Sequence, residues 1–490
     1  MVSLYEKNIS CLDEKDRKLL ADFNTFRDLK LVKTKNEEFT VKVNVKDRED
    51  IFLHSLYNPQ REAIRFADSQ DLTGKKSIVL IGFGLGYHVE EILSRLKREQ
   101  ALNIIVPNLD IFKLALENRD LTGVLRDERV KIVLAAEPAS FTREIQLLLD
   151  NLSSSVSQLI VHSQSIKIIP DGFLFFKDIL EEIRVSSYNS ERLGRAIKNN
   201  LIKNISLVNK TIGVKSFTGL FSEVPVFIIS AGPSLDKNIN VLEEIKDRGV
   251  IISVDTALTP LLKREIRPDF VVTIEPIKIV YDRVFSKYKD LDIPLLHTLG
   301  TNWKVVENYK GPKIIGLAKD DLIMDRLAEK VDKGRILTGG TVALTALDFA
   351  LQLGGNPIIF VGQDFAYSKE GITHASDTFY GNARKDISQL REIEGIVEDK
   401  VYTSTSYYLY LRKFERFIAE NKGITFIDAT EGGAKIKGTR IMTLKKVIST
   451  YCKFSFGRKE IITSVIREYK SQNNNLPVEK LRNFLKMELS

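Results

Sequence analysis

Two turns rich in glycine and hydroxyl side chains each join an apolar run to a helical pattern. The first, SAGPS at residues 230–234, follows the apolar run VFII. Gly232 has no Cβ and lets a ligand approach the backbone closely, while Pro233 presets φ for a helix start. Ser234 offers a hydroxyl beside free helix N–H groups, where an anion is favoured. The turn therefore predicts a site for a phosphate or a ribose.

The second turn is TGGT at residues 338–341, directly before the helical pattern VALTALDFALQL. A helix start built from small and hydroxyl-bearing residues suits a phosphate for the same reason. Each turn alone could be only a tight turn, but together they favour a nucleotide site. The residues expected to contact the nucleotide here are Thr338, Gly339, Gly340 and Thr341.

Polar side chains follow three of the predicted strands. Asp255 and Thr256 follow one strand, Glu275 follows the next, and Gln363 and Asp364 follow a later one. The two aspartates could instead be helix caps. Because the carboxyl ends of parallel strands meet at one edge of a sheet, we expect these side chains to surround the same ligand.

A general base is expected among the five histidines of the chain. His374 lies in the loop KEGITHASD, shortly after Asp364, and histidine suits proton transfer near neutral pH. Its alternative role is to cap a turn, in which case Asp364 is the next candidate for the catalytic residue. His297 lies in the apolar run LLHTLG and is predicted to be a core histidine. The other three fall in the first third of the chain.

Between residues 208 and 445, short apolar runs alternate with amphipathic helical patterns. This rhythm predicts an α/β fold with a central Rossmann-like domain, in which helices cover both faces of a parallel sheet. Helices are predicted at residues 235–248 and 258–265. The predicted strands are residues 226–229, 250–254, 270–274, 295–297, 313–316 and 357–361.

A smaller N-terminal α/β domain is predicted over residues 1–207. A helical connector is predicted at about residues 173–210, and it leads into the central domain. The motif IGFGLGYH of the N-terminal domain places Gly82, Gly84 and Gly86 between a strand at residues 77–81 and a helix at residues 88–96. Such turns hold a phosphate or adenosyl ligand in Rossmann-like units, but the next run, NIIVPNLD, does not end on an acidic residue. A structural domain is therefore favoured over a cofactor site. Residues 446–490 predict a helical C-terminal region.

The composition excludes several classes of protein. No run of 18 apolar residues and no apolar signal core is present, and the two cysteines lie near opposite ends of the chain. A cytoplasmic protein without a disulfide framework is expected. The net charge is +8, but 73 Lys+Arg are mixed with 65 Asp+Glu, so nucleic acid is not the expected partner.

In combination, the motifs SAGPSL, VDTAL, TGGTVA, FVGQDFAYS, THA and ATEGGA resemble the motility-associated factor (Maf) glycosyltransferases. The resemblance covers most of the chain. It implies transfer of a nonulosonic acid, pseudaminic or legionaminic, from its CMP-activated form to Ser or Thr of flagellin. It also implies a central domain similar to bacterial sialyltransferases, whose GPSL loop holds the CMP donor. Neither a metal nor a further cofactor is expected, because the donor carries one phosphate and the sequence shows no HExxH motif or cysteine cluster.

The residue patterns and the resemblance together give a donor-binding set and a catalytic set, in which His374 and Gln363 come from their positions in the sequence alone. Two other functions stay open: a pyrophosphate transfer from ATP, as in the related 6-hydroxymethylpterin diphosphokinases, and a non-catalytic flagellin-binding protein. The sequence leaves open the sugar, the acceptor residues and the oligomeric state. The catalytic set is His374 and Asp364, and the donor-binding set is Gly232, Pro233, Ser234, Asp255, Thr256, Thr338, Gly339, Gly340, Thr341 and Gln363.

Overall fold

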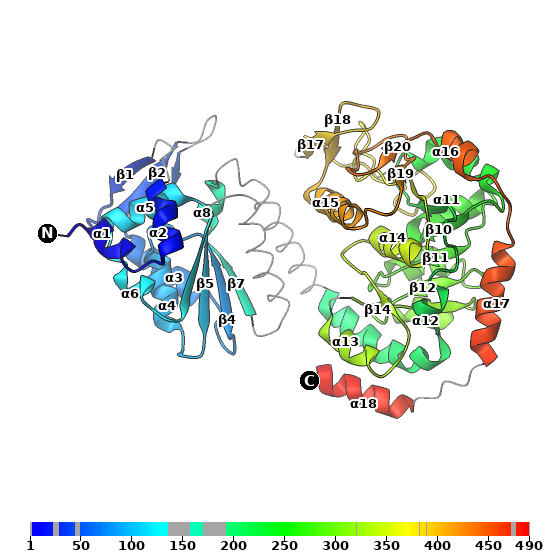
Figure 1. Cartoon of the computed structure of the whole chain (residues 1–490), viewed down its shortest axis with the longest axis horizontal. Coiled ribbons are helices and arrows are strands. Elements are labelled where there is room, and N and C mark those ends of the chain that lie inside the picture. The colour runs from blue at the N-terminus through cyan, green and yellow to red at the C-terminus, as the bar shows by residue number, and fades with distance from the viewer. Residues whose placement is uncertain are drawn as a thin grey trace. The chain divides into compact units, whose positions relative to one another are not determined.

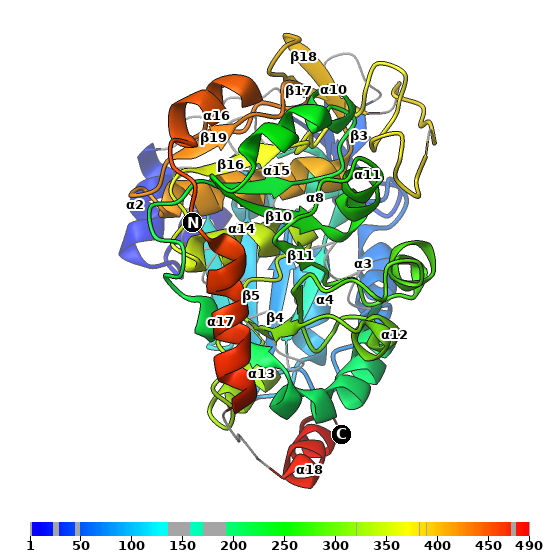
Figure 2. The ribbon, with the colours of Figure 1, turned by 90° about the vertical axis from the view of Figure 1, so that its right-hand side faces the viewer.

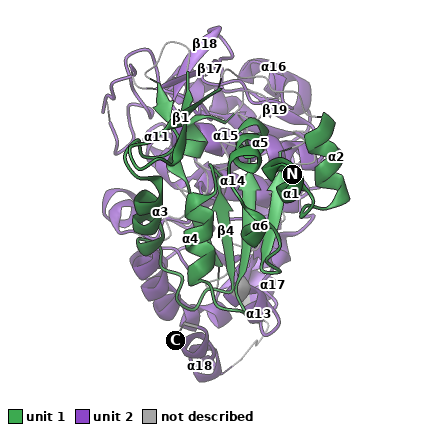
Figure 3. Cartoon of the chain, turned by 90° about the vertical axis from the view of Figure 1, so that its left-hand side faces the viewer, with its two compact units in different colours: residues 1–181 green, residues 182–490 purple. Residues whose placement is uncertain are grey.

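The computed structural model of the chain describes residues 2–22, 29–44, 50–135, 157–169, 193–319, 321–381, 383–388, 390–471 and 477–489 (Figure 1). The chain divides into two compact units, residues 1–181 and residues 182–490 (Figure 3). This division does not coincide with the boundaries predicted at residues 207 and 445. Part of the predicted connector, residues 173–192, lies outside the described residues, and residues 193–204 are helical.

A nine-stranded sheet forms the centre of the second unit, and every neighbouring pair in it is parallel. The α/β fold predicted from the sequence is therefore confirmed. The strand order is β20-β19-β16-β9-β10-β11-β12-β13-β8. The strands are β8 (Ile212–Gly213), β9 (Val226–Ile229), β10 (Val250–Val254), β11 (Phe270–Val272), β12 (Leu295–His297), β13 (Lys313–Ile315), β16 (Ile358–Val361), β19 (Phe426–Asp428) and β20 (Arg440–Ile441).

The order in which successive strands are added to this sheet reverses at β9. Strands β10 to β13 extend the sheet on one side of β9, and β16, β19 and β20 extend it on the other. The loops after β9 and β16 lie side by side, because the Ser230 N–H donates to Val361 O at 2.9 Å and the Gly232 N–H donates to Gly362 O at 2.8 Å. Open α/β sheets bind their ligands at such a point, beyond the carboxyl ends of the strands.

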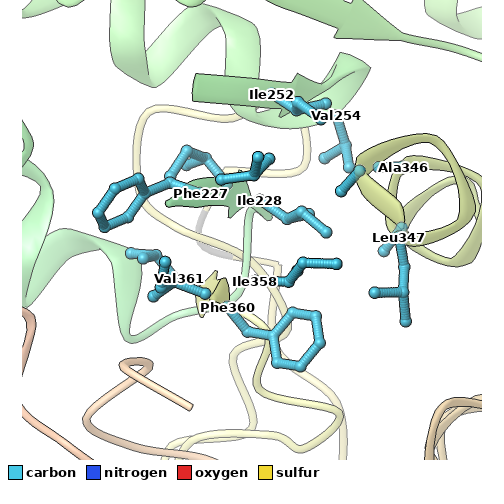
Figure 4. Packing of buried hydrophobic residues seen from close by; sticks show 14 of the residues in the cluster. Phe227, Ile228, Ile252, Val254, Ala346, Leu347, Ile358, Phe360 and Val361 are labelled. Carbon is cyan, nitrogen blue, oxygen red and sulfur yellow. The ribbon is translucent and has the colours of Figure 1, made fainter. Parts of the chain in front are cut away.

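Both faces of the sheet are buried, which explains why its strands are continuous apolar runs rather than alternating ones. Ile228 and Ile358 point toward the side on which α14 (Val342–Gln352) carries Ala346, whereas Phe227 and Val361 point to the opposite side (Figure 4). All five side chains are buried. Further helices of this unit are α11 (Leu258–Lys263), α12 (Trp303–Asn308), α13 (Leu322–Ala328), α15 (Thr405–Glu420) and α16 (Leu444–Tyr451).

The prediction of a helix over residues 235–248 is wrong beyond the first turn. α10 spans only Leu235–Asn238, and a 3₁₀ segment, Ile239–Ile245, follows it. The Asn238 side-chain amide donates to Ala429 O at 3.1 Å and to Thr430 O at 3.3 Å. Because these tertiary bonds hold Asn238 at φ −122° and ψ 1°, the α-helix stops there. The apolar side chains that recur at helical spacing in this segment are buried all the same: Leu235, Ile239, Leu242 and Ile245.

The C-terminal region is helical, as predicted. α16, α17 (Arg458–Ser471) and α18 (Val478–Leu489) follow one another from top to bottom in Figure 2. The Arg458 guanidinium contacts the buried Asp269 carboxylate at 2.6 Å, and the Lys333 ammonium donates to the Tyr469 hydroxyl at 2.7 Å. In the described part of the chain, no helix has both the length and the apolar character needed to cross a bilayer.

The first unit contains a four-stranded parallel sheet in the order β6-β5-β4-β7. The strand predicted at residues 77–81 is β4, and the helix predicted at residues 88–96 is α4, one residue earlier at each end. A three-stranded antiparallel sheet precedes them. The elements are β1 (Leu29–Lys33), β2 (Phe39–Val43), β3 (Ile51–Phe52), α3 (Pro59–Asp68), β4 (Ser77–Ile81), α4 (Tyr87–Arg95), β5 (Ala101–Val106), α5 (Leu109–Asn118), β6 (Val130–Leu134) and β7 (Ser157–Val161).

Candidate functional site

A cavity of about 760 Å³ lies at the carboxyl ends of the central strands of the second unit. Its volume falls in the range of about 300–1,000 Å³ that is typical of ligand pockets. Gly339 is not among its lining residues, and Pro233 and Ser234 face a different cavity. The structure brings the other predicted residues together around it: Gly232, Asp255, Thr256, Thr338, Gly340, Thr341, Gln363, Asp364 and His374.

A second cavity, of about 390 Å³, adjoins the first. Pro233 and Ser234 line it from one side, and Ser376 lines it from the loop that carries His374. Asp364 and His374 line both cavities. The two predicted catalytic residues therefore lie in the wall that the two cavities share.

The start of the first helix is occupied by a carboxylate of the chain itself. The Ser234 hydroxyl donates to Asp364 Oδ2 at 2.7 Å, and the Ser234 N–H points at Asp364 Oδ1 at 3.3 Å. A Cβ on Gly232 would lie 1.9 Å from the same Oδ2 atom. Gly232 thus makes room for Asp364, and the hydroxyl of Ser234 holds this carboxylate, whereas the sequence predicted a ligand at both residues.

Burial governs the charge of the two carboxyl groups predicted for the site. It raises the pKa of Asp364 to about 6, although the hydrogen bonds from Ser234 act in the opposite direction. It raises the pKa of Asp255 to about 7, and the nearby Glu275 adds to this shift. The oxygens of Asp255 accept hydrogen bonds from the Thr273 hydroxyl and from the Thr256 N–H, each at 2.7 Å. Asp255 therefore already has partners within the protein.

The start of α14 faces the larger cavity. Thr341, the N-cap residue, makes no side-chain cap bond, and Thr341, Val342 and Ala343 all line the cavity. The free N–H groups of an 11-residue helix carry a partial positive charge there. No Lys or Arg is among the described lining residues. The start of α14 thus supplies partial positive charge to an anionic ligand bound in this cavity.

His374 is held by a hydroxyl and by an aromatic ring. Its Nδ1 lies 2.7 Å from the Thr373 hydroxyl, and its ring stacks on Tyr380 with centroids 4.0 Å apart. Burial lowers the pKa of His374 to about 4, so the ring is neutral at pH 7 and one ring nitrogen can accept a proton.

Three tyrosines of the larger cavity were missed by the sequence reasoning. Tyr380 comes from the loop after β16, and Tyr407 and Tyr410 come from α15. Their rings provide flat surfaces on which a nucleobase can stack. The spacing of Tyr407 and Tyr410 places them on one face of a helix, but the sequence does not say which cavity that face meets.

Two family models match the chain. The model of the glycosyltransferase Maf N-terminal domain matches residues 27–162, and the model of the 6-hydroxymethylpterin diphosphokinase MptE-like proteins matches residues 199–370. Together with the fold, these matches support the Maf family of glycosyltransferases, with an MptE-like central domain. The Maf glycosyltransferase from Magnetospirillum magneticum AMB-1 has a similar fold, with a TM-score of 0.51 and 16% identity. That likeness covers 96% of this chain and 78% of the other.

Curated relatives match shorter parts of the chain. An uncharacterized protein from Treponema pallidum (strain Nichols) is 28% identical over 207 residues, which is 40% of this chain and 68% of that protein. The 6-hydroxymethyl-7,8-dihydropterin pyrophosphokinase of Methanocaldococcus jannaschii is 27% identical over 139 residues, which is 28% of this chain and 55% of that enzyme. The chain therefore spans little more than half of the length of the second relative.

Proposed function

We propose that this Maf protein transfers a nonulosonic acid, pseudaminic or legionaminic, from its CMP-activated form to Ser or Thr of flagellin. The observation that carries the proposal is the wall, containing Asp364 and His374, that the two cavities share. A group transfer requires a donor and an acceptor that reach the same catalytic residues from different directions. The identity of the sugar and of the acceptor rests on the resemblance of the motifs.

In this proposal the larger cavity holds the CMP donor. The start of α14 receives the phosphate, and the tyrosine rings flank the base. Thr338, Gly340 and Thr341 surround the phosphate, while Thr256 and Gln363 lie nearer the strand ends. No further cofactor is proposed for the reaction.

The smaller cavity admits the acceptor hydroxyl. Its oxygen attacks the anomeric carbon, the bond from that carbon to the phosphate oxygen breaks, and CMP leaves with the electron pair. The hydroxyl proton passes to His374, whose Nδ1 is held at the Thr373 hydroxyl and whose Nε2 is the proton acceptor. Asp364 positions the Ser230–Ser234 turn and is the alternative base.

The proposed acceptor route is tested by filling the smaller cavity. Ser376 is exposed and lines this cavity but not the larger one. We expect Ser376→Phe to abolish the mass increase of flagellin while CMP still raises the melting temperature of the protein. The matched control is Ser388→Phe, at an exposed serine that lines neither cavity. Normal flagellin modification by Ser376→Phe would show that the acceptor enters elsewhere.

A diphosphokinase is the second candidate, because the MptE-like model and the Methanocaldococcus enzyme match the central region. The two functions differ in their ligands. A thermal-shift panel with CMP alone and with ATP plus Mg²⁺ separates them, since a ligand that binds the folded state raises the melting temperature. A melting-temperature shift with ATP and Mg²⁺ but not with CMP would favour the kinase. If neither ligand shifts the melting temperature, a non-catalytic flagellin-binding protein is favoured.

The cytoplasm is the proposed location of the reaction. Both cysteines are free: Cys11 is half-buried and Cys452 is buried. Reduced thiols are the usual state of cysteine in that compartment.

A further inference from the structure

Three of the five histidines of the chain converge in the first unit. His54 follows β3, His88 lies in α4, and His162 follows β7. All three are buried, and one ring nitrogen of each lies within 4.8 Å of those of the other two. Segments that are far apart in the sequence thus present three imidazoles to one point.

This point lies at the strand where the order of the parallel sheet of the first unit reverses. β4 lies between β5 and β7, and the glycine-rich turn at residues 82–86 leaves β4 there. Gly84 makes room for His54, and Gly82 makes room first for Ser165, whose hydroxyl lies beside His162 Nδ1. A Cβ on Gly84 would lie 2.7 Å from His54 Nε2, and a Cβ on Gly82 would lie 3.3 Å from His162 Cβ. The turn that the sequence connected with a phosphate therefore packs around imidazole rings.

Each ring has a polar partner that can fix its orientation. His88 Nε2 lies 2.8 Å from Gly82 O, and His162 Nδ1 lies 2.8 Å from the Ser165 hydroxyl. His54 Nδ1 lies 3.7 Å from a carboxylate oxygen of Glu62. Metal-bound histidines usually donate their other ring N–H to a carbonyl, hydroxyl or carboxylate oxygen in this way.

The remaining ring nitrogens are the possible ligands. Among the described residues, His88 Nδ1 is buried without a hydrogen-bond partner, which is a costly state for a polar atom. His54 Nε2 accepts a hydrogen bond from the Leu85 N–H at 2.9 Å, so this nitrogen carries a lone pair. Burial lowers the pKa of all three rings, and a neutral imidazole is the form that binds a metal.

We propose that His54, His88 and His162 bind one first-row transition-metal ion, of which Zn²⁺ is the best fit to three neutral imidazoles. Zn²⁺ binds histidine nitrogen at about 2.0–2.1 Å, which places tetrahedral ligand nitrogens about 3.3 Å apart. The rings of His88 and His162 are stacked with centroids 4.1 Å apart. These two rings must tilt when the ion binds. His54 Nε2 must give up its hydrogen bond from the Leu85 N–H in order to bind the ion. The ion ties together the loop after β3, α4 and the loop after β7.

The test uses the full chain, treated with a chelator, and measures the binding of Zn²⁺ by calorimetry and of Co²⁺ by its visible absorption. We expect one ion per chain. His88→Gln removes the unpartnered nitrogen and abolishes binding, whereas His374→Gln, in the second unit, leaves binding unchanged. Glu62→Gln weakens binding about 10–100-fold, because it alters the partner of His54.

The proposal is overturned if the folded wild-type chain binds neither ion, or if His88→Gln binds as tightly as the wild type. Should His88→Gln fail to fold, the half-exposed Glu62→Gln decides: unchanged affinity would then overturn the proposal. None of these results depends on transfer activity, so they test the metal site separately from the proposed function.

Discussion

At the scale of single residues, Asp364 and His374 differ in the pH at which each gains a proton. Burial raises the pKa of Asp364 to about 6 and lowers that of His374 to about 4. A general base must be unprotonated, so the rate falls as the pH drops through the pKa of the base. The transfer rate should therefore decline near pH 4 if His374 is the base and near pH 6 if Asp364 is. A profile of the rate from pH 4 to 8, on intact protein, distinguishes the two.

The substitution His374→Gln tests the same assignment. Glutamine keeps an amide that can reach the Thr373 hydroxyl, but it cannot take up the proton of the acceptor. We expect transfer to slow by roughly 10²–10⁴-fold, while the affinity for CMP, measured by calorimetry, stays within about twofold. A wild-type transfer rate would remove His374 from the mechanism and leave Asp364 as the candidate.

At the scale of elements, the junction of α10 with its 3₁₀ continuation depends on one side chain. Asn238 is buried, and its amide donates to two backbone carbonyls of the segment after β19. Without this amide, Ala429 O and Thr430 O would each lose a partner in a site that water does not reach. The sequence pattern alone, with its apolar stripe, favours a continuous helix here.

We expect Asn238→Ala to lower the free energy of unfolding by roughly 1–3 kcal/mol, the usual penalty for buried polar groups left without partners. Urea denaturation measures it. Asn308→Ala is the matched control, because the amide of the half-buried Asn308 bonds only to Lys304 O within α12. If both substitutions have equal effects, the amide of Asn238 does not hold the junction.

At the scale of the whole molecule, buried ionisable groups predict a stability maximum between about pH 6 and 7. All five histidines have a lowered pKa in the folded protein. Below about pH 6.5 the unfolded chain therefore binds more protons at these residues than the folded protein does, which favours unfolding. Four carboxyl groups have a raised pKa and act in the opposite sense: Asp255 and Asp428 at about 7, and Asp269 and Asp364 at about 6.

Between pH 4 and 6 the unfolded chain thus holds about one more proton, five minus four, and stability rises with pH by about 1.4 kcal/mol per unit. Above pH 6.5 the histidines no longer contribute, and stability falls as Asp255 and Asp428 ionise in the folded protein. Melting temperatures of chelator-treated protein from pH 4.5 to 8.5 should show this maximum. A melting temperature that rises steadily to pH 8.5 would contradict it.

The sequence by itself determined the class of fold and the strands that support the site. β9, β10 and β12 begin and end where they were predicted, because strands buried on both faces are short, continuous apolar runs with clear ends. Both glycine-containing turns and the polar strand ends were also visible, because glycine and proline mark local backbone geometry. The combined motifs pointed to the Maf family, which the family models confirm.

Only the tertiary structure decided what each turn holds. Ser234 and Asp364 are 130 residues apart in the chain, and their contact exists because β16 pairs with β9. The same dependence on sheet order brings His162 beside His54 and His88, through the pairing of β7 with β4. Local sequence sets where strands begin and end, but contacts between distant segments follow from the order of the strands, which the burial of the whole core selects.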